Sequence, residues 1–388
     1  MNNTLKRYNM KNKYPIIYID PQSSGNLSAY DHGVLCKVNS PILYICSYHY
    51  DYMDMGDNIQ MFPIFSYNKI SNPLLKLLSY LCSMIRLFWI IACNRPAIIH
   101  IQWLRIPHFD YVFYWLVKLL LKPKIIFTAH NVLPHNTGNR YKGIYRKMYR
   151  LVNHIIVHAD ATRQEIQQDF NVEPDKISVI HHGTLKMSID SNELKRQETD
   201  YIQKYKTEGK IVFTSLGEQS HYKGIDLLVD IWQHTPELNT NGALQIIFAG
   251  KNVGIDFSPI SGSENVTIID ERISNEEYYF LLRQTDVYLL PYRKISQSGA
   301  LFTAMEQHVP VLVSDAGGLA EPLTIASIGW KVRAGDTTSL CNTLLHLAIH
   351  PEEIRKVKND SEGWKAVCDA YSWDNISCQT QQLYDKLS

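Results

Sequence analysis

The stretch YLLPYRKISQSGALFTAMEQHVPVLVSDAGGLAE, residues 288–321, contains two short apolar runs separated by a polar loop and a helical segment. The first run ends at Pro291, the loop carries Ser296–Gly299, and the second run, VPVLVSD, is followed by two glycines. Short apolar runs bounded by turn residues are typical of strands buried on both faces of a parallel sheet. The order strand, loop, helix, strand therefore predicts a βαβ unit whose loop lies at the ligand-binding edge of the sheet.

Apolar runs of the same kind recur along the whole chain, with helical patterns between them. They lie at 14–20, 41–47, 97–103, 124–130, 154–160 and 177–183, and then at 211–217, 244–250, 266–270, 286–292 and 309–315. Two successive series predict an α/β fold with two Rossmann-like, doubly wound domains facing a central cleft. We place the first domain at 1–188 and the second at 189–372, with the charged segment 191–210 as the connection between them.

Length and composition support a two-domain protein inside the cell. The 388 residues are too many for one ordinary core, and the net charge of +1 gives no global field that would attract nucleic acid. Seven cysteines without a C-x-x-C pair suit a reducing compartment. No long apolar segment precedes the first predicted strand, which predicts a cytosolic protein without a signal peptide.

Two apolar helical segments, 74–93 and 111–124, allow two interpretations. Lys76 and Arg86 interrupt the first, and a membrane-spanning helix would bury Arg86 near mid-bilayer at a cost of about 2.5–3.5 kcal/mol. The second carries three lysines. Either both helices pack against the first sheet, or they form a basic, tryptophan-bearing pair that rests on a membrane surface.

Several motifs, taken in order, resemble those of the GT-B glycosyltransferases, in particular the family 4-like group that uses nucleotide sugars. They are FTAHNVLPH at 127–135, VIHHG at 179–183, SLGEQSHYKGIDLLVDIW at 215–232, IIFAGKN at 246–252 and the stretch that ends at 321. The resemblance covers most of the chain and is strongest over 211–330. The ending YSWDNISCQTQQLYDKL resembles the family's C-terminal helix, which implies that 373–388 pack back on the first domain.

The resemblance implies a site for the diphosphate of the donor in the second domain. Gly217 and Lys223-Gly224 keep the spacing of the family's phosphate-binding loop, but Glu218 stands where the family has an arginine. A carboxylate there would repel phosphate, so a variant arrangement is expected.

A second departure concerns the family's E-x7-E pair. It falls on Ile295 and Thr303, neither of which is acidic, so the stereochemical outcome of the reaction is not implied. Ser298, Gly299 and Ala300 instead begin a helix, whose free N–H groups and dipole form a ready anion site. The alternative is that Ser298 is a plain N-cap. The donor-binding residues that we predict are Gly217, Lys223, Ser298, Gly299, Ala300, Thr303 and Glu321.

Three residues of the first domain are candidates for catalysis. His130 matches the family's histidine that faces the donor sugar, although a strand-end histidine can also simply bond to backbone. His135 is a second candidate of the same kind. Asp31 would be the base that deprotonates an acceptor hydroxyl if the enzyme inverts, or else a carboxylate at a helix start.

These observations predict a hexosyltransferase-type glycosyltransferase that needs no cofactor and no metal. The expected partners are a nucleotide-sugar donor and a saccharide acceptor on a polyprenyl carrier, in bacterial-type polysaccharide or lipopolysaccharide biosynthesis at the inner leaflet of the cytoplasmic membrane. Alternatives are a sugar-nucleotide epimerase of the same fold and a non-catalytic binding protein. Phosphorylase-like chemistry is disfavoured because no lysine is placed to carry pyridoxal phosphate.

Overall fold

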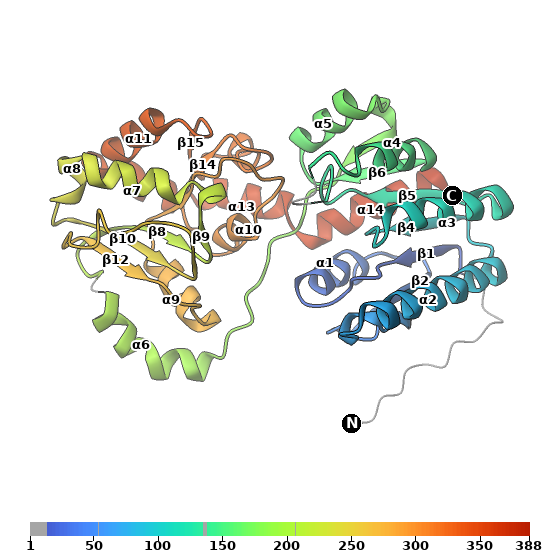
Figure 1. Ribbon diagram of the computed structural model, residues 1–388. Helices are drawn as coiled ribbons and strands as arrows, with labels where there is room; N and C mark the ends of the chain where they lie inside the picture. Colours follow the sequence, from blue (N-terminus) through green and yellow to red (C-terminus); the bar gives the residue numbers. More distant parts are fainter. Residues whose placement is uncertain (1–13, 53, 135–137, 206) are drawn as a thin grey trace. The chain divides into compact units, whose positions relative to one another are not determined.

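The computed structural model describes residues 14–52, 54–134, 138–205 and 207–388. The chain divides into two compact units, one with the residues up to 183 together with 371–388, and one with 184–370 (Figure 1). The first unit thus ends five residues before the boundary at 188 that the sequence analysis placed. His135 lies outside the described residues.

The first unit is built on a seven-stranded parallel sheet in the order β3-β2-β1-β4-β5-β6-β7. Its strands are β1 Ile16–Ile19, β2 Ile42–Ser47, β3 Ile59–Phe65, β4 Ile98–Ile101, β5 Lys124–Thr128, β6 His154–Val157 and β7 Ile177–Val179. The strand order changes direction between β1 and β4, which makes that point the switch point of a doubly wound sheet.

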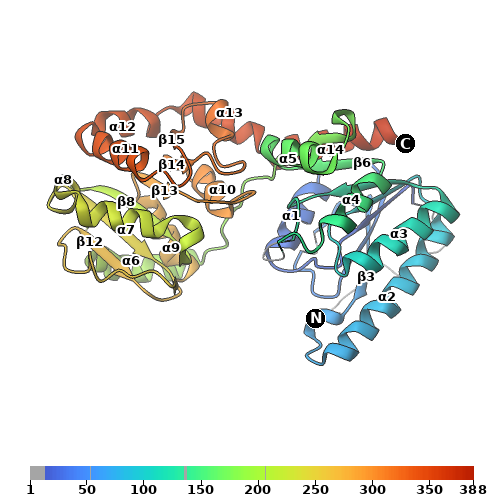
Figure 2. The ribbon, with the colours of Figure 1, turned by 45° about the horizontal axis from the view of Figure 1, so that its top comes forward.

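Helices cover both faces of this sheet (Figure 2). One core cluster joins the sheet to α2, α3, α4 and α5, and a second joins its other face to α1 and α14. The helices are α1 Asn26–Leu35, α2 Pro73–Asn94, α3 Pro107–Leu121, α4 Lys142–Leu151, α5 Asp160–Phe170 and α14 Trp373–Leu387, with short 3-10 turns η1 Tyr67–Lys69 and η2 Pro174–Lys176. The C-terminal helix α14 contacts α1, where the Ser377 hydroxyl donates to the Val34 carbonyl at 2.8 Å.

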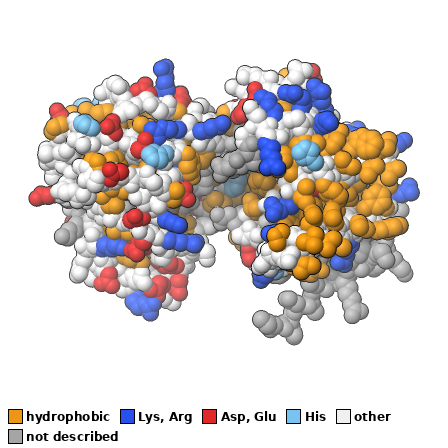
Figure 3. Space-filling view, viewed as in Figure 1, with side chains coloured by type: hydrophobic (Ala, Val, Ile, Leu, Met, Phe, Trp, Pro, Cys, Tyr) orange, Lys and Arg blue, Asp and Glu red, His pale blue; other side chains and the backbone are white. Residues whose placement is uncertain are grey.

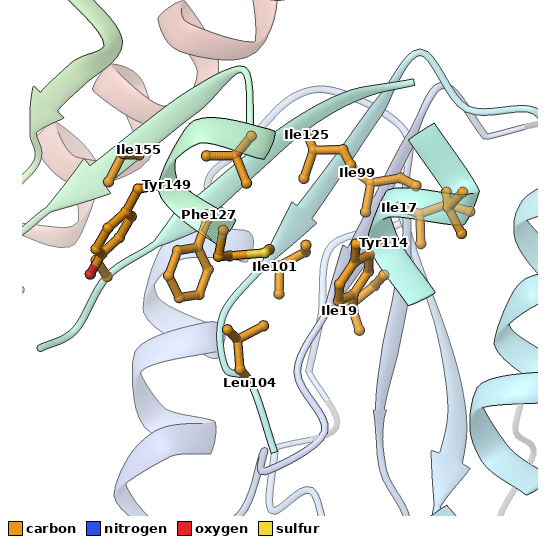
Figure 4. Packing of buried hydrophobic residues seen from close by; sticks show 14 of the residues in the cluster. Ile17, Ile19, Ile99, Ile101, Leu104, Tyr114, Ile125, Phe127, Tyr149 and Ile155 are labelled. Carbon is orange, nitrogen blue, oxygen red and sulfur yellow. The ribbon is translucent and has the colours of Figure 1, made fainter. Parts of the chain in front are cut away.

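The strands are apolar throughout because alternate residues pack on opposite faces. In β1, Ile17 and Ile19 belong to the cluster under α2 and α3, whereas Ile16 and Tyr18 belong to the cluster under α1 and α14. Figure 4 shows the first cluster, with Ile99 of β4 lying between Ile17 of β1 and Ile125 of β5.

The second unit repeats this architecture with six parallel strands in the order β12-β10-β8-β13-β14-β15. The strands are β8 Ile211–Leu216, β10 Leu244–Ala249, β12 Val266–Ile269, β13 Val287–Leu290, β14 Val311–Ser314 and β15 Gly329–Val332, while β9 Gln219–Ser220 and β11 Asn252–Val253 form a small separate pair. The helices are α6 Ser191–Tyr205, α7 Ile225–His234, α8 Pro236–Asn239, α9 Asn275–Gln284, α10 Gly299–Glu306, α11 Thr337–Ile349, α12 Pro351–Lys358 and α13 Ser361–Ala370, with 3-10 turns η3 His221–Lys223 and η4 Pro322–Thr324. The predicted fold of two doubly wound α/β domains is confirmed.

Two features of the fold differ from the prediction. The segment 191–210 is more than a connection, because α6 packs on α9, with the Tyr205 hydroxyl donating to Glu277 at 2.5 Å and Lys204 pairing with the same carboxylate. The edge strands β3 and β15 were not among the predicted strands, and β3 contains Pro63, which is tolerated in a strand with one open side.

Candidate functional site

Three loops of the second unit follow neighbouring strands and contact one another. They come after β8, β13 and β14, and the strand order changes direction between β8 and β13. In open α/β sheets this is the position at which ligands bind, beyond the carboxyl ends of the strands. The predicted donor-binding residues all lie on these loops or on the helix α10 that follows the second of them.

The loop after β8 brings a lysine against two glycines. Gly217 has a φ of 84° and Gly250 packs on it so closely that a Cβ atom on Gly250 would lie 1.9 Å from the Gly217 carbonyl oxygen. Lys223 Nζ lies 3.5 Å from the place where a Cβ of Gly217 would be. Burial lowers the pKa of Lys223, while the nearby Glu218 carboxylate opposes that shift. The ammonium is thus held at a glycine-lined strand end where an anion can approach closely.

The loops after β8 and β13 are tied together through Arg293, a residue that the sequence analysis did not single out. Its guanidinium forms a bidentate pair with Asp226 and donates to the His221 carbonyl at 2.7 Å. Gly224 fits against β13 so tightly that a Cβ there would lie 2.1 Å from the Pro291 carbonyl oxygen. The position of Lys223 is therefore set by contacts to the second loop.

Gly299, the first residue of α10, is exposed to solvent, whereas Ser298 before it is buried. The Ser298 side chain makes no N-cap hydrogen bond, and its hydroxyl lies 3.2 Å from the Tyr292 hydroxyl instead. The first amides of a helix have no partner within the helix, so those at the start of α10 are donors for a ligand. Thr303, by contrast, is 8% exposed and its hydroxyl donates to the Gly299 carbonyl at 3.0 Å. Its hydroxyl proton is thus used within α10.

The third loop carries Glu321 to the same edge of the sheet. The Gly318 amide donates to the Ser296 carbonyl at 3.1 Å, and a Cβ on Gly317 would lie 1.9 Å from the Ile295 carbonyl oxygen. Glu321 then precedes η4, and its carbonyl accepts from the Thr324 hydroxyl. The loop that carries Ser298 is therefore linked by short backbone contacts both to the loop that carries Lys223 and to the loop that carries Glu321.

The first unit holds a cavity of about 360 Å³ at the carboxyl ends of β4 and β5. Its walls combine aromatic rings with polar side chains, among them the Arg105 guanidinium and the imidazole of His130. The lining residues are Gln22, Gln102, Trp103, Leu104, Arg105, Pro107, Phe127, Thr128, His130, Asn131, Pro134, Tyr141 and Tyr145. A cavity with aromatic walls and a few polar groups is typical of a small-molecule site.

His130 lies in a network that the sequence analysis missed in part. Its ring stacks on Trp103 with centroids 4.4 Å apart, and its two nitrogens contact Gln102 and His158. Burial lowers the pKa of His130 well below its ordinary value, aided by the repulsion that His158 would exert when charged. The signal for His158 was present in the sequence, because HIIVHAD places it after β6 much as KIIFTAH places His130 after β5.

Asp31 does not lie where an acceptor can reach it. It sits within α1 with 0% exposure, and it accepts from the Tyr18 hydroxyl at 2.8 Å and from the Tyr44 hydroxyl. Burial raises its pKa to about 6, opposed by hydrogen bonds from Asp20 and the two tyrosines. This placement corrects the hypothesis that Asp31 is the catalytic base, since both carboxylate oxygens are engaged inside the core.

The outer sides of α2 and α3 form an exposed apolar surface, which we call the α2/α3 face. Its large exposed side chains are Leu74, Leu75, Leu77, Leu78, Ile85 and Trp89 on α2 and Val112, Trp115, Leu116, Leu119 and Leu120 on α3. Figure 3 shows a broad patch of hydrophobic side chains over this part of the first unit. The two helices are neighbours, because the Tyr80 hydroxyl of α2 donates to Asp110 of α3 at 2.7 Å.

The inner side of α2 is packed in the core. Tyr80, Met84, Leu87 and Ile91 recur at helical spacing and are nearly inaccessible to solvent. Among the described residues α2 is the one helix that is long and apolar enough to cross a membrane, and a third of its most apolar window is buried inside the unit. One side of α2 is therefore packed in the core, as the first interpretation from the sequence expects, and the other side is exposed.

Comparison with known proteins agrees with this architecture. A family model described as "Glycosyltransferase Family 4" matches residues 44–184, and one described as "Glycosyl transferases group 1" matches residues 208–350. An uncharacterised glycosyltransferase of Methanocaldococcus jannaschii is 22% identical over 241 residues, which are 59% of this chain and 59% of that protein. The match thus spans less than two thirds of the length of this relative.

Solved structures with the same fold cover nearly the whole chain. Sucrose-phosphate synthase of Thermosynechococcus elongatus superposes with a TM-score of 0.69 at 14% identity, over 97% of this chain and 99% of that one. HepE of Anabaena in complex with UDP has a TM-score of 0.68 at 12% identity, over 96% and 99% of the two chains. With the two family models matching one unit each, and the fold shared along both units, the chain belongs to the GT-B glycosyltransferases, in the group that is similar to family 4.

Proposed function

We propose that the protein transfers a sugar from a nucleoside diphosphate sugar to a saccharide acceptor that is attached to a lipid. The observation that carries the proposal is that Lys223 and the start of α10 lie on the loops after β8 and β13, the two strands that flank the switch point of the second unit. A departing nucleoside diphosphate is an anion, and a fixed ammonium with oriented amides stabilises such a leaving group. The proposal assigns this role to the protein's own groups rather than to a metal.

The donor proposal has support from a structural neighbour. HepE of Anabaena is described in complexes with UDP and with UDP-glucose. Identity to that protein is too low to carry over the base or the sugar, so we take from it only the class of ligand, a nucleotide sugar. Glu218 beside Lys223 is where this chain departs from the family, and Arg293 is committed to Asp226.

For the acceptor we propose the cavity of the first unit. Aromatic side chains such as Trp103 and Tyr145 offer apolar faces to sugar rings, and Gln102 and Asn131 offer hydrogen bonds to hydroxyl groups. Arg105, which lies over the Tyr67 ring at 5.6 Å, provides a cation for a phosphate on the acceptor. His130 is the candidate catalytic residue at this wall.

The α2/α3 face supports a lipid-linked acceptor and peripheral attachment to the inner leaflet of the cytoplasmic membrane. Exposed leucines and tryptophans can enter the interface between lipid head groups and acyl chains while the inner side of α2 stays in the core. Arg86, Lys122 and Lys124 are exposed basic residues on or beside this face. Each basic residue near an anionic surface contributes about 1 kcal/mol.

One of the predicted basic residues points elsewhere. Lys118 is half-buried and its ammonium donates to the Leu151 carbonyl, so it is directed into the unit. Burial lowers its pKa. The lipid contact that we propose therefore rests on the other basic residues and on the apolar side chains.

The function is tested by measuring release of nucleoside diphosphate from UDP-, GDP- and ADP-sugars, with and without lipid-linked saccharides. Release that depends on the acceptor, together with a glycosylated product, is the expected result. Conversion of a nucleotide sugar without acceptor would favour the epimerase. Tight binding of a nucleotide sugar with no turnover for any acceptor would favour the non-catalytic binding protein. Absence of binding to every nucleotide and nucleotide sugar would overturn the proposed function.

A further inference from the structure

His130 and His158 are in direct contact through ring nitrogens. His130 Nδ1 lies 3.1 Å from His158 Nε2, and His158 Nδ1 lies 2.8 Å from the Ile180 carbonyl oxygen. On its other side, His130 Nε2 lies 3.0 Å from the Gln102 side chain, at the wall of the cavity. The chain of contacts thus runs from a backbone carbonyl, through two imidazoles, to the cavity.

The direction of these hydrogen bonds follows from the Ile180 carbonyl, with which the series of contacts begins. A carbonyl oxygen only accepts, so His158 Nδ1 must carry the proton and donate. A neutral imidazole carries one N–H, which leaves a lone pair on His158 Nε2. This nitrogen accepts from His130 Nδ1, which in turn leaves the lone pair of His130 on Nε2.

We propose that His158 is a positioning residue that holds His130 as the neutral tautomer protonated on Nδ1, so that Nε2 accepts a hydrogen bond from a ligand in the cavity. The tautomer follows from the contacts of the first unit alone. That this tautomer contributes to turnover rests on the proposed function.

Burial favours the neutral state on which this argument depends. It lowers the pKa of His158 to about 3, with a further contribution from His182, and it lowers the pKa of His130 well below its ordinary value. His158 is 3% exposed, so water has little access to its ring nitrogens.

Neighbouring rings fix the orientation that the two imidazoles need. Trp103 lies parallel to the His130 ring at an interplanar angle of 3°. Tyr30 meets both His130 and His158 edge-on, with centroid distances of 4.9 and 5.2 Å. These ring contacts hold the planes of the two imidazoles, and the hydrogen bonds of the ring nitrogens determine which edge of each ring faces the other.

The proposal also determines the orientation of the Gln102 amide. In the structure the Gln102 Oε1 atom lies 3.0 Å from His130 Nε2, and the Gln102 NH₂ group lies on the other side, towards His100 and Thr128. A lone pair on His130 Nε2 requires a donor, so the proposal requires the Gln102 amide turned by 180°, with its NH₂ group facing His130 and its oxygen facing the other way. On that side lie the Thr128 hydroxyl at 3.2 Å and His100 Nε2 at 3.0 Å, both of which can donate. His100 Nδ1 then accepts from the Tyr384 hydroxyl at 2.7 Å, so the network is consistent throughout.

The test is the tautomer of His130 in the full-length protein, read from ¹⁵N chemical shifts of its ring nitrogens after labelling of histidines. A His130→Gln variant assigns the signals. We expect Nδ1 protonated and Nε2 unprotonated near neutral pH, without any ligand. A proton on Nε2, or a charged His130, would overturn the proposal.

Two substitutions of His158 separate positioning from mere packing. His158→Gln keeps an oxygen that can accept from His130 Nδ1 and should keep the tautomer, whereas His158→Phe removes the acceptor and should shift His130 towards protonation on Nε2. His154→Gln, at the first position of β6 and bonded to Ser178, is the matched control and should change nothing at His130. An unchanged His130 tautomer in His158→Phe would refute the role of His158. If His158→Phe does not fold, the wild-type and His158→Gln tautomers still decide the question.

Kinetics then connect the tautomer to turnover. If the protein is a transferase, His158→Phe should lower kcat for nucleoside diphosphate release more than it changes KM for the donor, and His158→Gln should restore most of the loss. Equal kcat in the wild type and in His158→Phe would refute the part in turnover while leaving the tautomer assignment to the spectra. Absence of activity in the wild type would instead count against the proposed function.

Discussion

At the scale of single residues, Lys223 is the positively charged side chain that we propose binds the diphosphate of the donor. Its ammonium lies against Gly217, and burial already lowers its pKa. A bound diphosphate would place negative charge beside this buried ammonium. The attraction between the two would be strong, because a charge held away from water interacts more strongly with its partner.

Replacement of Lys223 by alanine should weaken nucleotide-sugar binding by about 1.5–3 kcal/mol, the range for a hydrogen bond to a charged group. Calorimetric titration with the donor measures this change. Lys331→Ala, an exposed lysine on β15, is the matched control and should bind as the wild type does. Equal donor affinity in Lys223→Ala and Lys331→Ala would remove Lys223 from the site.

His130 should matter for turnover more than for folding. His130→Ala removes one stacked ring and two hydrogen bonds at a partly exposed position, so we expect the melting temperature to fall by only a few degrees, about 2–4 °C for each kcal/mol lost. The transfer rate should fall by most of its value. His108→Ala, an exposed histidine of α3, serves as the control. A fully active His130→Ala enzyme, or one that unfolds, would contradict this expectation.

At the scale of elements, the loop that carries Lys223 depends on how closely it packs on the end of β13. Gly224 has a φ of 76°, and a Cβ there would lie 2.1 Å from the Pro291 carbonyl oxygen. Gly254 also has a positive φ, of 86°, but no atom lies within 4 Å of its Cβ position. The two glycines thus share a left-handed backbone conformation, which strains a residue with a Cβ atom, and they differ in steric contact.

Alanine at either glycine should cost about 1–2 kcal/mol of unfolding free energy for the left-handed backbone. Gly224→Ala should cost a further 1–3 kcal/mol or so for overpacking, and it should weaken donor binding because the loop must move away from β13. Urea unfolding and calorimetry measure both effects. Equal losses in Gly224→Ala and Gly254→Ala would show that the close contact to Pro291 does not position the loop.

From the α2/α3 face we predict that the protein binds to membranes that contain anionic lipid. The protein should float with vesicles that contain anionic lipid at low salt, and less so at high salt, because exposed basic charges are screened. Replacing Ile85 and Trp89 together by serine should abolish flotation without loss of stability, since their exposures are 62% and 64%. Ile349→Ser, on the second unit and 70% exposed, is the matched control.

Flotation that is equal for the wild type and the Ile85/Trp89 double variant would reject this face as the site of attachment. Absence of any binding to anionic vesicles at low salt, with full activity on a short soluble acceptor, would reject the membrane proposal and leave the transferase proposal standing.

At the scale of the whole molecule, stability should fall as the pH drops below the ordinary pKa of histidine. Burial lowers the pKa of five histidines of the first unit, to about 3 for His100 and His158, to about 4 for His154 and His182, and well below 6.5 for His130. Between about pH 6.5 and 4 the unfolded chain therefore binds protons that the folded chain does not, which lowers the free energy of unfolding.

Three buried aspartates act in the opposite direction. Burial raises the pKa of Asp31 and Asp110 to about 6 and that of Asp20 well above its ordinary value. In the folded state they bind protons above the pH at which unfolded carboxylates do, which adds stability as the pH falls from about 6 to 4. Because the histidines outnumber them, the net stability should still decrease on acidification. Each net proton contributes at most about 1.4 kcal/mol per pH unit.

Hydrogen exchange of the sheet amides of the first unit, compared at about pH 7 and about pH 5 after correction for intrinsic rates, measures this change. Protection should be lower at the acidic pH. Equal or greater protection there would mean that the aspartates dominate, or that the histidines are protonated in the folded protein.

Most of the fold could be predicted from the sequence because a buried parallel strand leaves a local signature. Runs such as KIIFTAH and VPVLVSD are apolar over the length of a strand and end in polar or turn residues, and this holds whatever their neighbours are. The spacing from Gly217 to Lys223-Gly224 likewise lies within one loop. The loops of the second unit that we propose for the donor could therefore be located from the sequence, at the ends of their strands.

Only the tertiary structure decided which polar groups are available and which sides of helices are covered. Asp31 resembles a candidate base in sequence, yet Tyr18 and Tyr44 from two other elements enclose it. His158 and His130 lie 28 residues apart and meet because β5 and β6 are adjacent in the sheet. The apolar length of α2 is the same whether it lies in a core or on a surface, so its exposed side could not be predicted. The burial of a side chain and its hydrogen-bond partners depend on segments that are distant in the chain. Local sequence patterns therefore do not determine either of them.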